Sequence, residues 1–267
     1  MKRPRFPVVV IAALVAANLL LVGTVVYPVS TDAPRSAADA FEPADPAAFA
    51  LAATIEVDGN TTLQVEGAVA DSGERYVRIE QDGSIVERYQ PDGVDGPEHV
   101  RYALGDAAAE DRLGQLEADD DVTVLGVERS GETTTIRAVD TEPDADVGDR
   151  IPGAASVVTT QLGLVQYDRV DDAGQAETVV LQPESGWYTG DQSYRVANAE
   201  GTVEIDPETS ALYAADVRWD LTRGTETYLH YLVNRESTVG QTITYDYRTE
   251  DVAVDPPDWI VESPDDR

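Results

Sequence analysis

The sequence predicts a mainly β fold of the α+β class, an antiparallel sheet with a few covering helices, preceded by one transmembrane helix. Three observations carry this prediction. Short segments rich in β-branched and aromatic residues recur at roughly ten-residue spacing, with Asp-Gly, Asn and Ser-Gly turns between them. Apolar and polar side chains alternate along the last segments, as in a sheet with one buried face. A single long apolar run lies near the N-terminus.

The apolar run covers residues 8–26, which are 19 residues without a charge and with one amide, Asn18. A helix of about 20 such residues spans the hydrocarbon core of a bilayer. The charges before it are all basic: Lys2, Arg3 and Arg5. Since the first acid follows only at Asp32, we expect residues 1–30 to form a cytoplasmic stub and a membrane anchor, with the rest of the chain outside the cell membrane. A cleaved signal peptide is the alternative, although its apolar region is usually about 7–15 residues long.

The charge balance is extreme. The 267 residues include 51 acidic and 19 basic ones. Residues 31–267 contain all 51 acidic residues and only 16 basic ones, so their formal charge is −35. Lys2 is the only lysine. This composition indicates a halophilic protein, because molar salt screens the self-repulsion of such a surface. It argues against nucleic acid and anionic headgroups as partners. The absence of cysteine excludes thiolate metal sites and a cysteine nucleophile.

The outer chain is expected to comprise a stalk over 31–46, a β-rich domain over 47–260 and an acidic tail over 261–267. Proline, alanine and aspartate dominate the stalk, which predicts little fixed structure. Asp45 and Pro46 look like a helix start, so a short helix is expected over 47–53. The strands expected in the first half of the domain are 53–58, 61–69, 74–81, 84–90, 97–104, 122–128 and 133–139.

Two further helices are expected in the domain. One covers residues 106–117. After a polar linker at 142–149, Pro152 opens the other, whose buried face is marked by helical spacing: Ala155, Val158, Leu162 and Val165.

The C-terminal part is again expected to consist of strands, over 176–182, 186–189, 193–197, 201–206, 210–219, 225–234 and 240–248. Alternation is clear in the last three of them. In the final strand Ile243, Tyr245 and Tyr247 share one face and Asp246 lies on the other. The pattern is that of a half-buried antiparallel meander.

Residues 201–213 (GTVEIDPETSALY) form a strand, an Asp-Pro turn and a returning strand, and the meander closes on 245–257 (YDYRTEDVAVDPP). This order resembles the last third of the LolA/LppX-like lipoprotein-carrier fold, as found in secreted and membrane-anchored proteins of halophilic archaea. The match covers roughly residues 176–257 and holds no catalytic motif. The resemblance implies a strongly curved sheet or half-barrel, closed by helices, whose hollow holds a lipid or lipidated protein. The chain lacks the lipidated cysteine of some members, so the membrane helix would replace that anchor.

No nucleophile motif, metalloprotease motif, phosphate loop or dinucleotide fingerprint occurs, so neither an enzyme nor a cofactor is expected. His99 and His230 stand 131 positions apart and are interpreted as ordinary histidines, with a shared metal site as the alternative. The acid clusters at 119–121 and 144–149 lack the ligand spacing of a calcium loop and are interpreted as solvated loops. Asn60 begins an Asn-Thr-Thr glycosylation pattern in an expected turn.

Tyrosine is concentrated in the last third of the chain. On neighbouring strands these rings would line one hollow and suit an apolar ligand, although tyrosine also fills ordinary β cores. The residues assigned to ligand binding are Tyr213, Tyr228, Tyr231, Tyr245 and Tyr247. The leading hypothesis is a tethered binding module for a lipid or other apolar ligand. The alternative is an envelope protein with a filled core that docks onto other envelope proteins.

Overall fold

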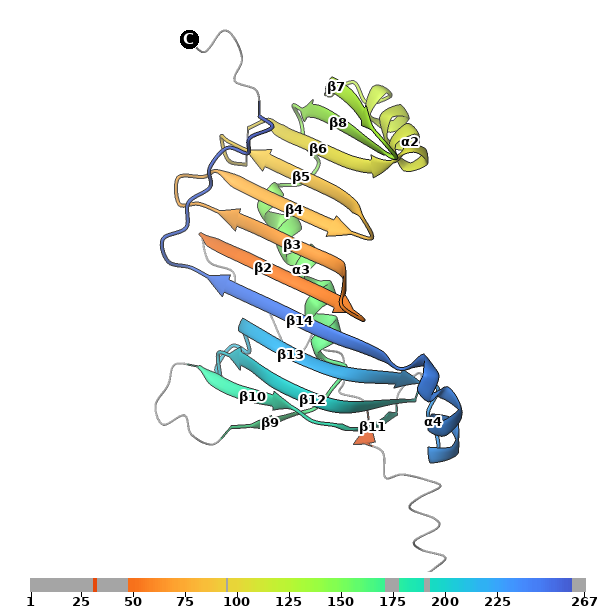
Figure 1. Ribbon diagram of the computed structural model, residues 1–267. Coiled ribbons are helices and arrows are strands. Elements are labelled where there is room, and N and C mark those ends of the chain that lie inside the picture. The colour runs from red at the N-terminus through yellow and green to blue at the C-terminus, as the bar shows by residue number, and fades with distance from the viewer. Residues whose placement is uncertain (1–30, 33–47, 95, 171–177, 190–192, 261–267) are drawn as a thin grey trace, which may run out of the picture.

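The computed structural model describes residues 31–32, 48–94, 96–170, 178–189 and 193–260 of the chain. One large open sheet dominates this part (Figure 1). Thirteen of its strands are antiparallel to their neighbours, and a two-residue strand joins the edge in parallel. The strands are β1 (Thr31–Asp32), β2 (Phe49–Val57), β3 (Asn60–Val69), β4 (Arg75–Gln81), β5 (Ser84–Gln90), β6 (Glu98–Gly105), β7 (Val122–Ser130), β8 (Thr133–Asp140), β9 (Tyr167–Arg169), β10 (Val179–Pro183), β11 (Gly186–Thr189), β12 (Tyr194–Ile205), β13 (Leu212–Arg223) and β14 (Val239–Arg248).

The strand order is β1-β11-β12-β13-β14-β2-β3-β4-β5-β6-β8-β7, and β10 lies beside β12 with β9 beyond it. The pair β14–β2 joins the C-terminal meander to the N-terminal one, with Tyr245 opposite Ala53. Tight turns connect the sequential strands. Asp58 and Gly59 both have positive φ, 52° and 76°, as the two-residue turn between β2 and β3 requires. The mainly antiparallel β class predicted from the sequence is therefore confirmed.

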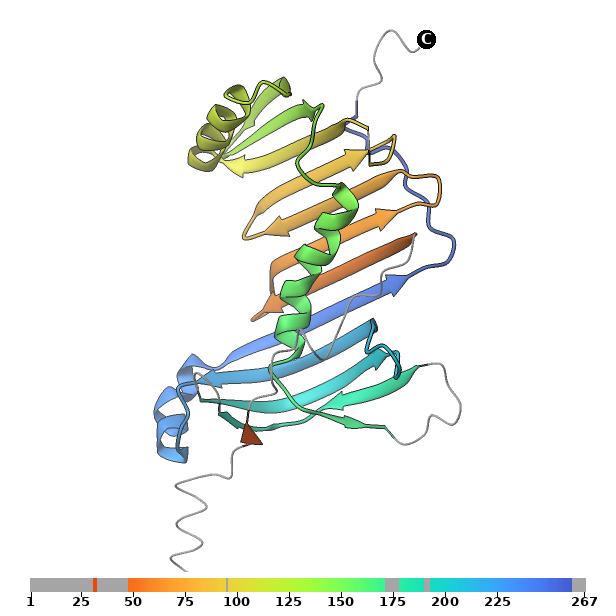
Figure 2. The same cartoon turned by 180° about the vertical axis from the view of Figure 1, so that it is seen from behind.

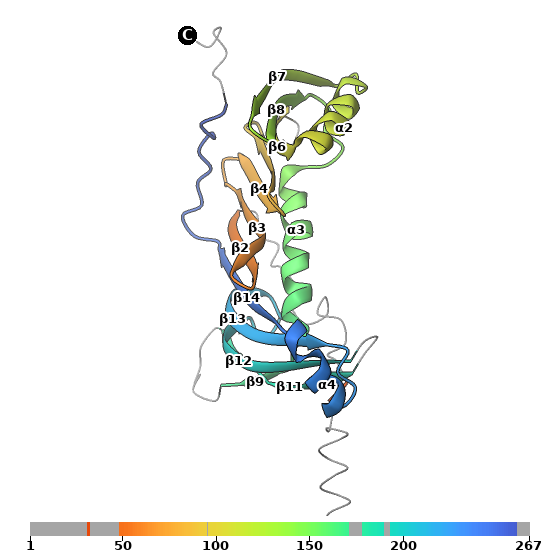
Figure 3. The same ribbon diagram turned by 45° about the vertical axis from the view of Figure 1, so that its right-hand side comes forward.

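Three α-helices accompany the described strands: α2 (Asp106–Glu117), α3 (Val147–Leu162) and the short α4 (Tyr228–Asn234), which continues into the 3-10 turn η2 (Arg235–Ser237). Seen from behind, α3 runs along the sheet and crosses most of its strands (Figure 2). Figure 3 shows α2 and α3 on the same side of the sheet. None of the helices among the described residues is long and apolar enough to cross a membrane, and the apolar run 8–26 lies outside that part.

The main core fills the space between α3 and the sheet. Inward positions of β2, β3, β13 and β14 alternate with solvent-facing ones, and α3 presents Ile151, Ala155 and Val158 to them. The closest approach is at Gly67 of β3, where a Cβ atom would lie 2.8 Å from three side-chain carbons of Ile151. Real Cβ contacts are not that short, so α3 can pack this closely only over glycine.

A second, smaller core lies under α2. It contains Val100 and Tyr102 of β6, Ile136 and Ala138 of β8, and Ala109 and Leu116 of the helix. Helix 106–117 is confirmed, although its N-cap is Gly105 and the carboxylate of Asp106 instead accepts a hydrogen bond from the Thr134 hydroxyl, at 2.9 Å. The buried face expected for the other long helix is confirmed at Ala155, Val158 and Leu162, whereas Val165, also buried, lies beyond the end of that helix.

Four segment predictions were wrong. Residues 225–234 form α4 and not a strand, because Thr227 caps a helix there by accepting the His230 N–H through its hydroxyl, at 3.2 Å. The expected helix at 47–53 is replaced by β2, whose inward side chains recur every second residue. The linker at 142–149 ends early, because Asp146 caps α3 and Pro152 lies inside that helix. The segments 193–197 and 201–206 belong to the single strand β12, which bulges between them.

Outside the β-rich domain, Thr31 and Asp32, the first residues of the expected stalk, pair with Tyr188 and Thr189 of β11 as β1. The remainder of the expected stalk and the acidic tail at 261–267 lie outside the described residues.

Candidate functional site

An apolar groove opens at the edge of the main core. It has a volume of about 600 Å³ and lies between one flank of α3 and the end of the sheet where β2 turns into β3, β13 ends and β14 begins. Pockets for small ligands usually measure about 300–1,000 Å³. The lining residues are Ile55, Val57, Thr62, Leu63, Gln81, Asp82, Val157, Gln161, Leu221, Arg223, Ser237, Val239 and Gln241.

Strand register explains why aliphatic side chains meet there. Leu221 of β13 lies opposite Val239 of β14, and Val57 of β2 lies opposite Gln241. These are inward positions near the strand ends, where α3 no longer covers the sheet fully. On α3, Val157 and Gln161 stand one turn apart on the flank of the buried stripe. Val157 is therefore 48% exposed although it is apolar, and it forms the helix wall of the groove.

A short chain of amide hydrogen bonds forms the polar part of the groove. The indole N–H of the buried Trp219 donates to Gln241 Oε1 at 3.2 Å. Gln241 Nε2 then donates to Gln161 Oε1 at 3.0 Å. These bonds fix both amides against the apolar wall, and Arg223 supplies a cation at the rim. Apolar walls with a few oriented polar groups are typical of a site for an apolar molecule with a small polar head.

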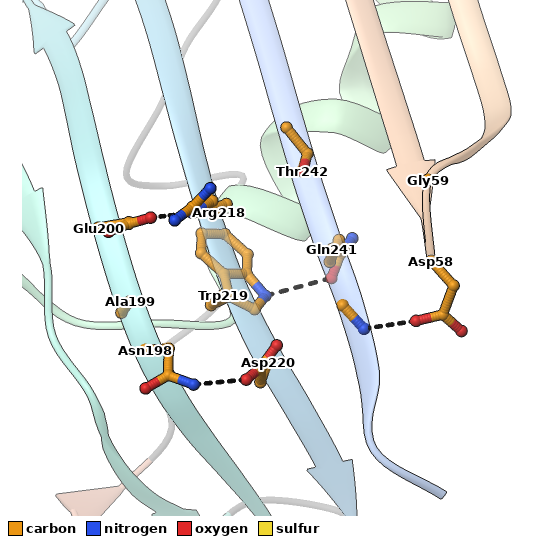
Figure 4. A pocket seen from close by; sticks show the side chains of 11 residues that line it. Asp58, Gly59, Asn198, Ala199, Glu200, Arg218, Trp219, Asp220, Gln241 and Thr242 are labelled. Atoms are coloured by element: carbon orange, nitrogen blue, oxygen red, sulfur yellow. Dashed lines mark hydrogen bonds and ion pairs between the residues drawn. The ribbon is translucent and has the colours of Figure 1, made fainter.

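A second depression, of about 580 Å³, lies on the face of the sheet that α3 does not cover (Figure 4). Most of its charged and amide side chains have a partner within the depression. Arg218 forms an ion pair with Glu200, Asn198 donates to the Asp220 carboxylate at 2.6 Å, and Asp58 accepts the Gly240 N–H at 2.8 Å. These contacts join β12, β13, β14 and the β2–β3 turn, so they are accounted for as structural links.

A third cavity, of about 250 Å³, lies against the second core and is lined by Val100, Tyr102, Leu116 and Ala138 of that core. Beside it the carboxylate of Glu98, which is 0% exposed, pairs with Arg88 and lies 3.9 Å from the Arg150 guanidinium. Arg88 and Arg112 also donate to the Tyr102 hydroxyl. These buried charges form a seam beside the start of α3. The seam also includes the ion pair of Arg75 with Asp146, the N-cap of α3. This charged seam positions the first turn of α3 over β4, β5 and β6.

The structure divides the five tyrosines assigned to ligand binding into two groups. Tyr213, Tyr245 and Tyr247 lie toward the end of β14 that is remote from the groove. The Tyr247 ring stacks on Phe49, with 5.6 Å between ring centroids, and the Tyr213 centroid lies 6.4 Å from that of Tyr247. Tyr245 is buried, which raises the pKa of its phenol, and its hydroxyl has no hydrogen-bond partner in the structure. Tyr228 and Tyr231 lie on α4, at the opposite end of β14.

The other residues considered from sequence are dispersed. His99 lies on β6, where burial lowers its pKa, and His230 lies exposed on α4 at the far end of the molecule (Figure 1). Asp146 of the second acid cluster is the N-cap of α3, and Asp119 of the first accepts the Asp121 N–H at 3.1 Å. Asn60 is exposed at the start of β3.

Sequence reasoning missed the groove. Alternation along a strand predicts which aliphatic side chains point inward, but it does not indicate whether a helix covers them or leaves them open to a ligand. One signal was available. Val157 is a large apolar residue off the stripe that Ala155, Val158 and Leu162 mark on its helix.

Comparison of the chain with protein-family models, with curated proteins and with solved structures finds no match. The hairpin on which the lipoprotein-carrier resemblance rests is formed, since β12 ends at Ile205 and β13 begins at Leu212. Hairpins of this kind occur in many β folds, so the resemblance stays a prediction.

Proposed function

We propose that the chain is a membrane-tethered binding module that holds a lipid or another apolar molecule outside the cell. The observation that carries the proposal is the apolar groove beside α3, with Val157 open to it. On this proposal the sheet is a half-barrel of the lipoprotein-carrier kind. Helix α3 crosses its hollow, and the groove is the part of the hollow that the chain's own side chains leave open.

The size and chemistry of the groove support such a ligand. Burial of a hydrocarbon chain contributes about 0.8 kcal/mol per methylene, so about ten methylenes supply about 8 kcal/mol before the cost of ordering the chain. Without that cost, about 8 kcal/mol would correspond to a micromolar dissociation constant, so the net affinity is weaker than micromolar. The Gln161 and Gln241 amides and the rim cation Arg223 would then receive the polar head of the ligand.

The tether follows from the apolar run 8–26 and the basic residues before it. It would keep the module at the outer face of the cell membrane, where apolar ligands are concentrated. No step of this function requires a nucleophile or a cofactor.

Filling the groove tests the proposal. We expect Val157→Trp to weaken binding of the apolar dye Nile red at least about tenfold, or about 1.4 kcal/mol, because the indole occupies the open space. Fluorescence titration at molar salt measures this, on a chain beginning at Thr31 so that the apolar run does not bind dye. Val127→Trp is the matched control, because Val127 is 41% exposed on β7, far from the groove. Equal dye binding by both variants would contradict a ligand site in the groove.

A second candidate is an envelope protein that binds other proteins. The observation that favours it is the sheet edge at β7, the last strand in the order, on which Leu125 and Val127 are exposed. Open edges of this kind accept an added strand from a partner. Unchanged dye binding in Val157→Trp together with stable capture of a strand by β7 would favour this candidate over the first.

A further inference from the structure

Helix α4 exposes most of its apolar side chains. Tyr228, Leu229, Leu232 and Val233 are all exposed, with Val233 at 79%, and none of the seven residues of the helix is buried. Four large apolar residues exposed on one short helix cost free energy in water unless another apolar phase covers them.

The helix is held in this position by specific contacts. Tyr231 packs edge-to-face on Trp187 of β11, with 5.9 Å between ring centroids, and the Arg195 guanidinium lies 4.4 Å above the Tyr231 ring. At its end, Asn234 Nδ2 donates to the Gly224 carbonyl at 2.9 Å. Helix α4 is therefore fixed on β11 and the end of β13, with its apolar residues directed away from the core.

The position of β1 places this helix near the expected membrane anchor. Thr31 of β1 pairs with Tyr188 of β11, the neighbour of Trp187. The apolar run ends at Val26, so five residue steps separate it from Thr31 and cover at most about 18 Å when fully extended. Figure 1 shows β1, β11 and α4 at the same end of the molecule.

The charge around α4 differs from that of the whole chain. Residues 223–237 contain two arginines, Arg223 and Arg235, and two glutamates, Glu226 and Glu236, and are therefore neutral in a chain with a formal charge of −32. This segment therefore adds no net negative charge that anionic headgroups would repel.

We propose that α4 lies against the outer surface of the bilayer to which the chain is tethered, with Leu229, Leu232 and Val233 in the headgroup region. This inference rests on the membrane tether of the proposed function. The groove is open toward this helix, because Ser237, the last residue of η2, and Val239, the first residue of β14, line its wall. An apolar ligand would pass between bilayer and groove along this segment.

The absence of cysteine makes a direct test possible. Leu229→Cys in the full chain is labelled with an environment-sensitive fluorophore and reconstituted in phosphatidylglycerol and phosphatidylcholine vesicles that carry doxyl-labelled lipid, at molar salt. Interfacial helices bury their apolar face about 5–10 Å deep, so we expect the doxyl lipid to remove about half of the fluorescence or more. Leu125→Cys is the matched control, since Leu125 is 59% exposed on β7 and Leu229 is 58% exposed. Quenching at Leu229 no stronger than at Leu125 would overturn the inference.

Two additional measurements separate this inference from the proposed function. Flotation of the labelled chain with the vesicles tests the tether, and a chain that does not float removes the basis of both. Combining Leu229→Cys with Val157→Trp fills the groove, so this variant tests the contact of α4 with the bilayer independently of ligand binding. Quenching that persists in this variant supports the contact of α4 with the bilayer even when the groove binds nothing.

Discussion

Replacing Glu98 by glutamine is expected to lower the free energy of unfolding by about 3–5 kcal/mol, the usual cost of removing one partner of a buried ion pair. Glu98 is fully buried on β6 and is paired with Arg88 of β5 and with Arg150 of α3. Glutamine keeps the shape but loses the charge. The guanidinium groups of Arg88 and Arg150 then lose the one carboxylate with which both are paired.

Chemical denaturation at constant molar salt measures this loss. Glu128→Gln is the control, because Glu128 also pairs with an arginine, Arg137 at 2.9 Å, but is largely exposed. Exposed pairs of this kind contribute about 0–1 kcal/mol. A loss for Glu98→Gln as small as that for Glu128→Gln would show that the seam does not hold α3 on the sheet.

The second large effect is expected where α3 touches the sheet. Gly67→Ala places a methyl group against the buried Ile151 and should destabilise the fold by about 1–3 kcal/mol. Ile151→Ala leaves a cavity and should cost about 2–5 kcal/mol. In the double variant the new methyl group enters the space that the isoleucine left, so the two losses should not add, with a coupling of about 0.5–3 kcal/mol.

A double-mutant cycle of unfolding free energies tests this packing. Gly114→Ala is the control, because no atom lies within 4 Å of a Cβ built at Gly114 and alanine favours the helix it lies on. Strictly additive losses for Gly67→Ala and Ile151→Ala would contradict the direct contact between β3 and α3.

Much of the fold followed from local chemistry in the sequence. The turn at Asp58 and Gly59 and the alternation of Ile243, Tyr245 and Tyr247 with polar residues are readable without tertiary information, because each reflects a backbone or burial requirement of its own segment. The buried stripe of α3 was readable for the same reason.

The failures arose where two periodicities compete. Residues 225–234 have high β-propensity and were predicted to form a strand, but the Thr227 cap and the contact of Tyr231 with Trp187 favour a helix. Asp45 and Pro46 suggested a helix start, although the pairing of Phe49 with Val69 and the burial of Phe49 and Leu51 favour a strand. Because the strand at 225–234 was wrong, the five tyrosines could not form one wall. The groove depends on where α3 ends relative to the strand ends, which no local pattern records.

We propose that the groove beside α3 holds an apolar molecule. Native mass spectrometry with solvent extraction tests it most directly, on the chain beginning at Thr31 and purified from a high-salt host. This chain keeps every described element and lacks the apolar run 8–26, so lipid bound by that run does not contribute. We expect one lipid or similar apolar molecule per chain, and its loss in Val157→Trp but not in Val127→Trp. A wild-type chain that is empty and stays empty when offered lipid would contradict the account and favour a protein-binding role for the sheet.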